Sequence, residues 1–291
     1  MSKPSPVFNR MHQGTFAEAT VRGRPPLLSP RQNLLLAALP RDEYERLLAY
    51  LVRVPLPLDL VLHDSGEREK FVYFPTEGRV SRVHIMADGS QAEFAVTGCE
   101  GAIGISSFLG GGSTPSLAIV SGAGYAYRME ASRLHDLFEQ GGALAHILLR
   151  YTQALMTQIT QTAVCNRHHT VDQQLCRWLL SSLDRSPGAE LAVTQQAIAE
   201  KLGVRRESVT DAARHLQEAG LIKLRRGSLA VLDRSGIERR VCECYAVVKR
   251  EYDRLLFEKR SQSPLPQPVA APAGPGSGRV PRRVAACALG D

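Results

Sequence analysis

The sequence lacks the long apolar segments and catalytic motifs by which many protein classes are identified. No run of about 18 apolar residues could cross a membrane, and no signal-peptide pattern opens the chain. No Gly-x-Ser-x-Gly elbow, P-loop or dinucleotide-binding fingerprint occurs. We therefore expect a cytoplasmic protein that is not an enzyme, has no catalytic residues and has no membrane partner.

Cysteine is scarce, and its spacing matches no standard metal motif. The six cysteines are Cys99, Cys165, Cys176, Cys242, Cys244 and Cys287. None forms a Cys-x-x-Cys pair, and the single residue between Cys242 and Cys244 is too short for a usual metal clamp. We interpret the cysteines as reduced thiols and predict no metal ligands, with a redox role as the alternative.

The positive charge is unevenly distributed along the 291 residues, a length sufficient for two domains. Residues 165–260 carry 18 Lys and Arg against 13 Asp and Glu, whereas residues 31–164 carry 11 against 14. The formal net charge of +7 therefore resides in the C-terminal half and the two tails. Such a distribution suits contact with a polyanion.

Residues 194–222 have the periodicity of a helix-turn-helix. Gly203 falls in the expected turn, where a positive φ is needed, and the small Ala199 falls where the two helices would cross. Thr194 is a plausible N-cap of the first helix. The apolar positions that would face the core are Ile198, Leu202, Val204, Val209 and Ala212.

The polar face of the second helix suits the major groove of DNA. Arg can donate twice to guanine, and Glu can accept from cytosine N4. Residues 221–232 then form two short apolar runs around an Arg-Arg-Gly-Ser turn, which predicts a β-hairpin wing. The alternative is an ordinary solvated surface helix. The candidate DNA-binding residues are Gln195, Arg205, Arg206, Glu207, Thr210, Asp211, Arg214, Arg225 and Arg226.

The N-terminal half alternates between short apolar runs and turn signals. Helical segments are expected at residues 33–39 and 42–54, and Asp88-Gly89 is a favourable hairpin turn. Many short strands at this spacing predict a small antiparallel barrel or jelly roll. The expected strands are residues 56–62, 71–74, 79–86, 92–96, 116–120 and 125–129.

Residues 142–167 are expected to form a long helix with a seam for a second helix. The seam follows a four-three-four spacing, and Gln158, Thr162 and Cys165 continue it with weaker residues. We predict a homodimer through this helix; the alternative is that the helix packs only on its own barrel. The predicted dimer interface consists of Leu144, Leu148, Tyr151 and Leu155.

This order of elements resembles the family of the bacterial cyclic-AMP receptor protein and the fumarate-nitrate regulator, the Crp/Fnr family. The resemblance covers roughly residues 31–260 and is strongest at residues 194–223 and 71–104. It implies an α+β fold: an N-terminal antiparallel β-roll like a cyclic-nucleotide-binding domain, a long dimerisation helix, and a C-terminal winged helix-turn-helix.

The resemblance also implies a domain organisation and a set of partners. We expect a homodimeric transcription regulator that reads near-palindromic double-stranded DNA, with RNA polymerase and a small-molecule effector as candidate further partners. The expected boundaries are a disordered segment at 1–30, the roll at 31–141, the dimerisation helix at 142–167, the DNA-binding domain at 168–260, and a disordered tail at 261–291.

Two departures from the family pattern bear on function. Arg206 and Glu207 match the family's base-reading pair, but Asp211 stands where an Arg usually follows. In the roll, Ile105 replaces the Glu that takes the ribose hydroxyl, and no Arg follows for the cyclic phosphate. We therefore expect no cyclic-AMP binding and leave the cofactor or effector unknown.

Two other classes of function are weighed against the regulator. A cupin-like metal enzyme would need a cluster of His and Glu, but His63 and His84 are isolated, and Glu93 or Glu100 alone cannot complete a site. A non-catalytic ligand-binding or scaffold protein could use its winged helix to bind protein. Salt-dependent binding to DNA fragments distinguishes this scaffold from a DNA-binding regulator.

Overall fold

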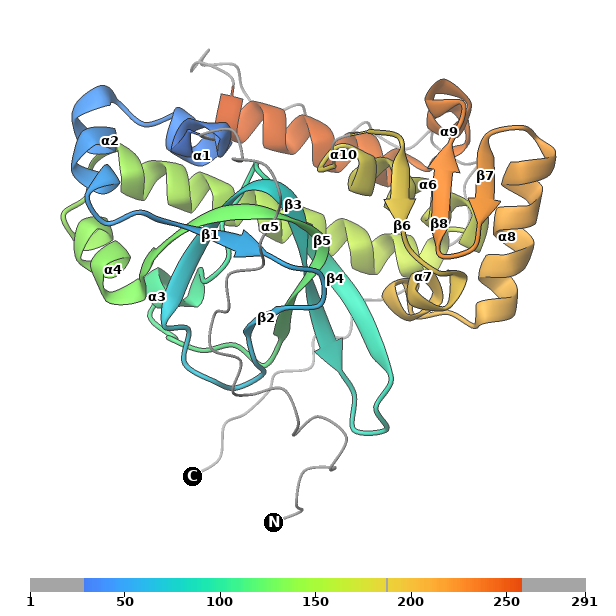
Figure 1. Cartoon of the computed structure of the whole chain (residues 1–291), viewed down its shortest axis with the longest axis horizontal. Coiled ribbons are helices and arrows are strands. Elements are labelled where there is room, and N and C mark those ends of the chain that lie inside the picture. The colour runs from blue at the N-terminus through green and yellow to red at the C-terminus, as the bar shows by residue number, and fades with distance from the viewer. Residues whose placement is uncertain (1–28, 187, 258–291) are drawn as a thin grey trace, which may run out of the picture. The chain divides into compact units, whose positions relative to one another are not determined.

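The computed structural model describes residues 29–186 and 188–257 (Figure 1). The predicted disorder of residues 1–30 and 261–291 falls, except for Ser29 and Pro30, outside the described residues. A short 3₁₀ helix, η1 (Pro30–Gln32), opens the described chain. No helix in the described ranges has both the length and the apolar character needed to cross a bilayer.

The N-terminal half is an antiparallel roll preceded by two short helices, α1 (Leu34–Ala37) and α2 (Arg41–Leu48). The central strand β5 pairs with β1, β2 and β3, and β3 pairs with β4 on its other side. The roll is closed by an apolar core that includes Val54, Leu56 and Val80. Its strands are β1 (Val52–Leu56), β2 (Val61–His63), β3 (Phe71–Ile85), β4 (Gln91–Thr97) and β5 (Leu117–Glu130).

Three of the predicted strand boundaries differ from the structure. Residues 71–74 and 79–86 form one strand, β3, and residues 116–120 and 125–129 form one strand, β5. Between these two predicted strands, Gly78 lies in a bulged bend of β3, where the register of β3 on β5 shifts at Pro75/Glu77 and again at Glu77/Arg79. Residues 56–62 split into β1 and β2, and Asp59 between them has a φ of 63°.

Helix α3 (Ser106–Leu109) lies between β4 and β5 of the roll, and α4 (Ala131–Glu139) and the long α5 (Gly142–His168) lead from the roll to the C-terminal half. The predicted interface residues of α5 are buried within their own chain. Leu144, Leu148, Tyr151 and Leu155 are 6%, 0%, 0% and 1% exposed, and they pack in the core that includes Phe74. They are therefore not available to a partner chain, because the roll fills the seam that the spacing had assigned to a second helix.

The C-terminal half begins with α6 (Val171–Leu183), whose N-terminus is closed by a Thr170–Gln173 capping box. The small sheet has the order β6-β8-β7, and β6 was not predicted. The last two α-helices of the described chain are separated at Val241 and Cys242. The remaining elements are β6 (Glu190–Ala192), α7 (Gln195–Leu202), α8 (Arg206–Glu218), β7 (Ile222–Arg225), β8 (Ser228–Val231), α9 (Arg234–Arg240), α10 (Glu243–Tyr252) and the π-helical turn η2 (Asp253–Phe257).

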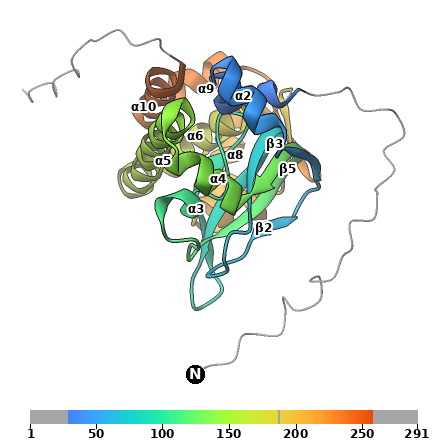
Figure 2. The ribbon, with the colours of Figure 1, turned by 90° about the vertical axis from the view of Figure 1, so that its left-hand side faces the viewer.

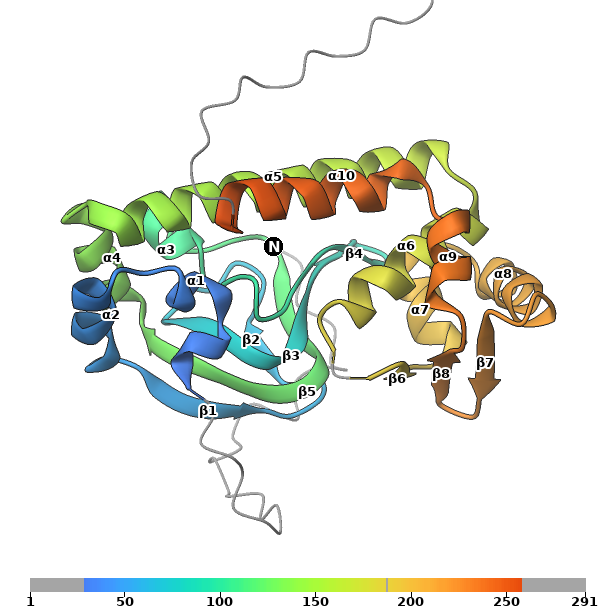
Figure 3. The same cartoon turned by 90° about the horizontal axis from the view of Figure 1, so that it is seen from above.

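Helix α10 turns back and runs beside α5 (Figures 2 and 3). The Tyr252 hydroxyl donates to Gln158 Oε1 over 3.1 Å, and the Tyr151 and Tyr252 rings meet edge-on at 6.5 Å. Tyr151 also donates to the carbonyl of Ala102 over 2.9 Å. These tyrosines therefore connect α10, α5 and the roll in one buried core. The α+β fold expected from the sequence is confirmed.

The bend at Gly78 generates a prediction for stability. Gly78 has a φ of 80°, and a Cβ there would lie 2.4 Å from the Gly122 carbonyl oxygen. Gly78→Ala should cost about 2–5 kcal/mol of unfolding free energy, because strain of the left-handed backbone adds to overpacking. The control is Gly89→Ala, where φ is 85° but a Cβ would meet nothing within 4 Å. The control should cost only about 1–2 kcal/mol; equal losses in urea unfolding would show that the close approach at Gly78 is unimportant.

Candidate nucleic-acid interface

Helices α7 and α8 are fixed by the local features that the sequence predicted. The Thr194 side chain accepts from the backbone N–H of Ala197, and Gly203 ends α7 with a φ of 67°. Ala199 is 2% exposed where the two helices pack. The predicted core positions are buried, with Val204 partly so, and they form the centre of a core that also includes Leu175 and Leu179 of α6.

The opposite face of α8 is exposed and polar. Arg205, Arg206 and Glu207 are exposed at its first turn, and none of the three makes an ion pair within the described residues. No side chain caps the helix, so its first N–H groups lack a side-chain acceptor. The positive end of the α8 dipole and two unpaired arginines therefore face solvent together.

The remaining predicted residues of α8 are held by neighbouring side chains. Thr210 Oγ1 donates to Gln195 Oε1 over 3.0 Å, and this contact joins the start of α7 to α8. Arg214 Nη2 lies 3.3 Å from Asp211 Oδ1, and both side chains are well exposed. Asp211 therefore pairs with Arg214 on the exposed face of α8 and is not an isolated carboxylate there.

The wing is the β7–β8 hairpin, and both predicted arginines lie exposed at its tip. Arg225 Nη1 is 3.5 Å from Glu190 Oε1 of β6, and the Ser228 hydroxyl donates to the same oxygen over 2.7 Å. Lys223 and Arg225 are two residues apart in β7, so both side chains lie on the same exposed face of the strand. Lys223 was not predicted as a DNA-binding residue, although this alternation could have been recognised in the sequence. A groove of about 450 Å³ between helix and wing is lined by Gln195, Arg206, Arg225 and Ser228.

Two ion pairs join the roll to the C-terminal half, on elements next to this exposed surface. Lys201 Nζ of α7 lies 3.0 Å from Glu93 Oε2 of β4, and Arg185 Nε lies 2.6 Å from Glu100 Oε1. The Arg185 and Glu100 side chains are only 8% and 12% exposed. Burial lowers the pKa of Arg185, but the Glu100 carboxylate, Tyr252 and Asp184 together raise it, so the net pKa of Arg185 lies above its ordinary value. Arg185 is therefore positively charged.

The carboxylates and histidines weighed for a cupin-like site are not brought together as a free ligand set. Glu93 and Glu100 are held by Lys201 and Arg185. His63 is buried, and that burial lowers its pKa. His84 is exposed on β3. Nothing in this part of the described chain assembles the metal cluster that a cupin-like enzyme requires.

Comparison by sequence identifies the C-terminal domain. The family model for the Crp-like helix-turn-helix domain matches residues 173–240, which run from α6 through the wing to α9. A search of the curated proteins finds no match.

Comparison by structure extends the likeness to the roll and the long helix. FixK2 from Bradyrhizobium japonicum aligns at 16% identity with a TM-score of 0.56, over 66% of this chain and 98% of that one. The c-di-GMP responsive global regulator CLP from Xanthomonas campestris aligns at 18% with a TM-score of 0.55, over 67% and 100%. TTHB099, a transcriptional regulator of the CRP family from Thermus thermophilus, aligns at 19% with a TM-score of 0.54, over 65% and 95%.

At these identities the structural likeness establishes a shared fold, and the matched domain establishes the family of its C-terminal part. Residues 173–240 are a Crp-like helix-turn-helix domain, and the chain has the fold of the Crp/Fnr family of transcription regulators.

Proposed function

We propose that this chain is a homodimeric transcription regulator that reads a near-palindromic site in double-stranded DNA through α8. The observation that carries the proposal is the exposed polar face of α8, on which Arg206 and Glu207 stand unpaired beside the basic wing. Half-site centres should lie about 10–10.5 base pairs apart, or a multiple of this spacing, because a two-fold dimer meets the same groove once per turn.

Within this proposal, the helix and the wing have different roles. Arg206 has the planar fork that guanine O6 and N7 require, and Glu207 accepts from cytosine N4. Arg205, Arg225 and Arg226 neutralise phosphates and fix the register of the protein on the duplex. The Asp211–Arg214 pair replaces the usual second arginine, so the preferred half-site should differ there from that of the cyclic-AMP receptor protein.

Selection of bound sequences from a random DNA pool tests direct reading by Arg206. Arg206→Ala should cost about 1–3 kcal/mol on the best site and flatten the preference at one base pair per half-site. As a control, Arg225→Ala combined with Arg226→Ala should weaken all sequences alike and reduce the salt slope by roughly one per lost phosphate contact. An unchanged sequence logo for Arg206→Ala would exclude direct reading by this residue. Binding that never depends on salt would favour a winged helix that binds protein.

The dimer interface that we propose uses another face of α5. Leu149 and Met156 are 50% and 62% exposed, stand seven residues apart and are followed by Val164 at 41%. The seven-residue interval between Leu149 and Met156 is the heptad repeat of a coiled-coil seam. These three side chains lie on the face of α5 that is covered neither by the roll nor by the core described above. A pair of α5 helices joined here would place two copies of α8 in one particle.

Sedimentation tests this interface. Met156→Asp should give folded monomers with greatly weakened operator binding, because the charge enters the seam but no intrachain core. Met86→Asp is the control, because the exposed fraction of Met86, 56%, is similar to that of Met156, but Met86 lies on the roll. Leu148→Asp, in contrast, should unfold the chain. A wild-type monomer at micromolar concentration with DNA bound would contradict the proposal.

The roll is not expected to use cyclic nucleotides as its signal. The buried Glu69 carboxylate accepts from both the backbone N–H and the hydroxyl of Ser106 at the start of α3. Both donors are therefore already satisfied within the chain, and Ile105 beside them packs on the core. The Glu69 carboxylate would also repel a phosphate placed next to Ser106.

Calorimetry provides the corresponding test. Cyclic AMP and cyclic GMP should produce no binding heat at micromolar protein, whereas the same sample should bind its selected DNA site, which shows that the protein is folded. Micromolar affinity for either nucleotide would refute the proposal that the roll does not bind cyclic nucleotides.

A further inference from the structure

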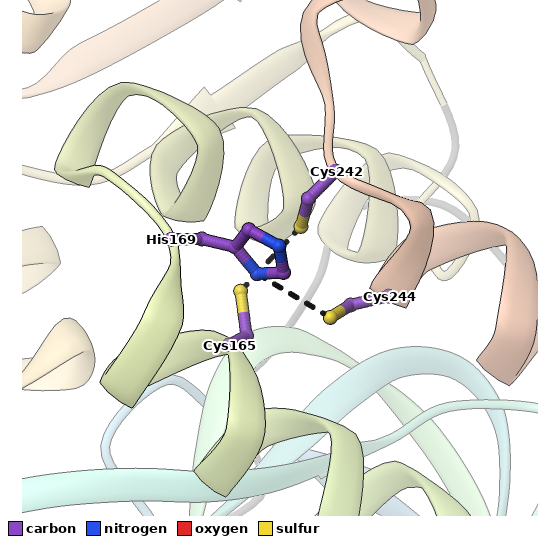
Figure 4. Close-up of side chains that lie close together, drawn as sticks. All are labelled: Cys165, His169, Cys242 and Cys244. Carbon is purple, nitrogen blue, oxygen red and sulfur yellow. Dashed lines mark hydrogen bonds between the residues drawn. The ribbon is translucent and has the colours of Figure 1, made fainter. Parts of the chain in front are cut away.

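Four side chains with metal-ligating atoms converge where α5 ends and α10 begins (Figure 4). Cys165 lies in the last turn of α5, and His169 caps that helix. Cys242 is the N-cap of α10, and Cys244 lies in its first turn. The three sulfur atoms and one imidazole nitrogen all lie within 4.8 Å of one another.

The distances fit the ligand shell of a single ion. Cys165 Sγ and Cys242 Sγ are 3.6 Å apart, and Cys244 Sγ and His169 Nδ1 are also 3.6 Å apart. A tetrahedral zinc ion with bonds of about 2.3 Å to sulfur and about 2.0 Å to nitrogen has ligand–ligand edges of about 3.5–3.8 Å. Two of the six edges thus have the length expected for such a tetrahedron, and the other four are no longer than 4.8 Å.

The histidine is oriented as a metal ligand usually is. While Nδ1 faces the thiols, Nε2 on the other side of the ring lies 3.4 Å from Glu243 Oε2. A carboxylate on the far nitrogen fixes the ring and raises its basicity, as is common for zinc-bound histidines. Glu243 is 74% exposed, so this partner reaches the site from the solvent side.

The burial of the thiols supports a structural site. Cys165, Cys242 and Cys244 are 0%, 4% and 1% exposed and form a cluster of their own with Val241. Three Cys and one His form a closed shell that leaves no open position for a substrate. Because Cys165 and Cys242 are 77 residues apart in the sequence, an ion here would cross-link α5 to α10.

Other chemistries fit the cluster less well. A disulfide needs sulfur atoms about 2.05 Å apart, whereas Cys165, Cys242 and Cys244 are all free thiols. An iron–sulfur cluster places inorganic sulfide between its protein ligands and spreads them farther apart than a single ion does. From the geometry we propose that Cys165, His169, Cys242 and Cys244 bind one structural Zn²⁺, contrary to our expectation from sequence that the chain has no metal ligands.

The position of the site gives the ion a definite role. It lies at the junction between the long helix and α6, the first helix of the DNA-binding domain. Zinc would fasten α10 there, and α10 in turn covers Gln158 and Tyr151 on α5. Because the ion binds the folded arrangement of two distant segments, it would stabilise that arrangement by mass action.

Elemental analysis of the full chain, purified under reducing conditions without added metal, is the decisive experiment. We expect one zinc ion per chain, lost in Cys242→Ser and in Cys165→Ser. Cys176→Ser is the matched control, because Cys176 is equally buried on the adjacent α6 but lies outside the cluster. The control should retain its zinc.

Two further measurements keep the test independent of folding defects in the cysteine variants. Co²⁺ exchanged into the wild type should show the d–d bands of a tetrahedral ion and thiolate charge transfer, and Cys244→His should retain the ion with weaker charge transfer. Glu243→Gln, which removes no ligand, should lower zinc affinity roughly 10–100-fold. Wild-type protein without zinc, iron with acid-labile sulfide in its place, or zinc unaffected by Cys242→Ser would each overturn the proposal.

Discussion

The packing of α5 against its own roll is the constraint on which the rest of the structure depends. Tyr151, with no exposed surface, is hydrogen-bonded to the roll through Ala102 and contacts Tyr252 of the returning chain. One face of α5 thus packs on the roll and another receives α10, while the end of α5 leads into α6. A change in the packing of α5 against the roll would therefore also shift α10 and the start of α6.

The local parts of the fold could be predicted from sequence because local residues determine them. Thr194 and Gly203 define the ends of α7, and periodicity alone identifies the buried side of α8. The strands were harder to predict, since Gly78 permits a bulge as readily as a turn, and only its pairing with β5 decides between them. A short apolar run does not reveal whether it ends a strand or continues through a bend.

The sequence analysis was least accurate where a feature depends on which distant segment packs against it. The spacing of Leu144, Leu148 and Leu155 correctly indicates an apolar seam, but the roll of the same chain fills it. The cluster at His169 was missed for a related reason: its ligands come from segments that tertiary packing alone brings together. Spacing within either segment matches no known motif, and a search limited to short motifs cannot find such a site.

The two ion pairs between the roll and the C-terminal half should respond to salt differently from the exposed arginines of the proposed DNA-binding surface. Arg185–Glu100 and Lys201–Glu93 are largely shielded from water, whereas Arg205, Arg206, Arg225 and Arg226 are exposed to it. The screening length falls from about 10 Å at 0.1 M salt to about 3 Å at 1 M, which suppresses exposed contacts far more than buried ones. Raising the ionic strength should therefore weaken contacts made by the exposed arginines, such as the proposed contacts with DNA, more than it weakens the ion pairs that join the C-terminal half to the roll.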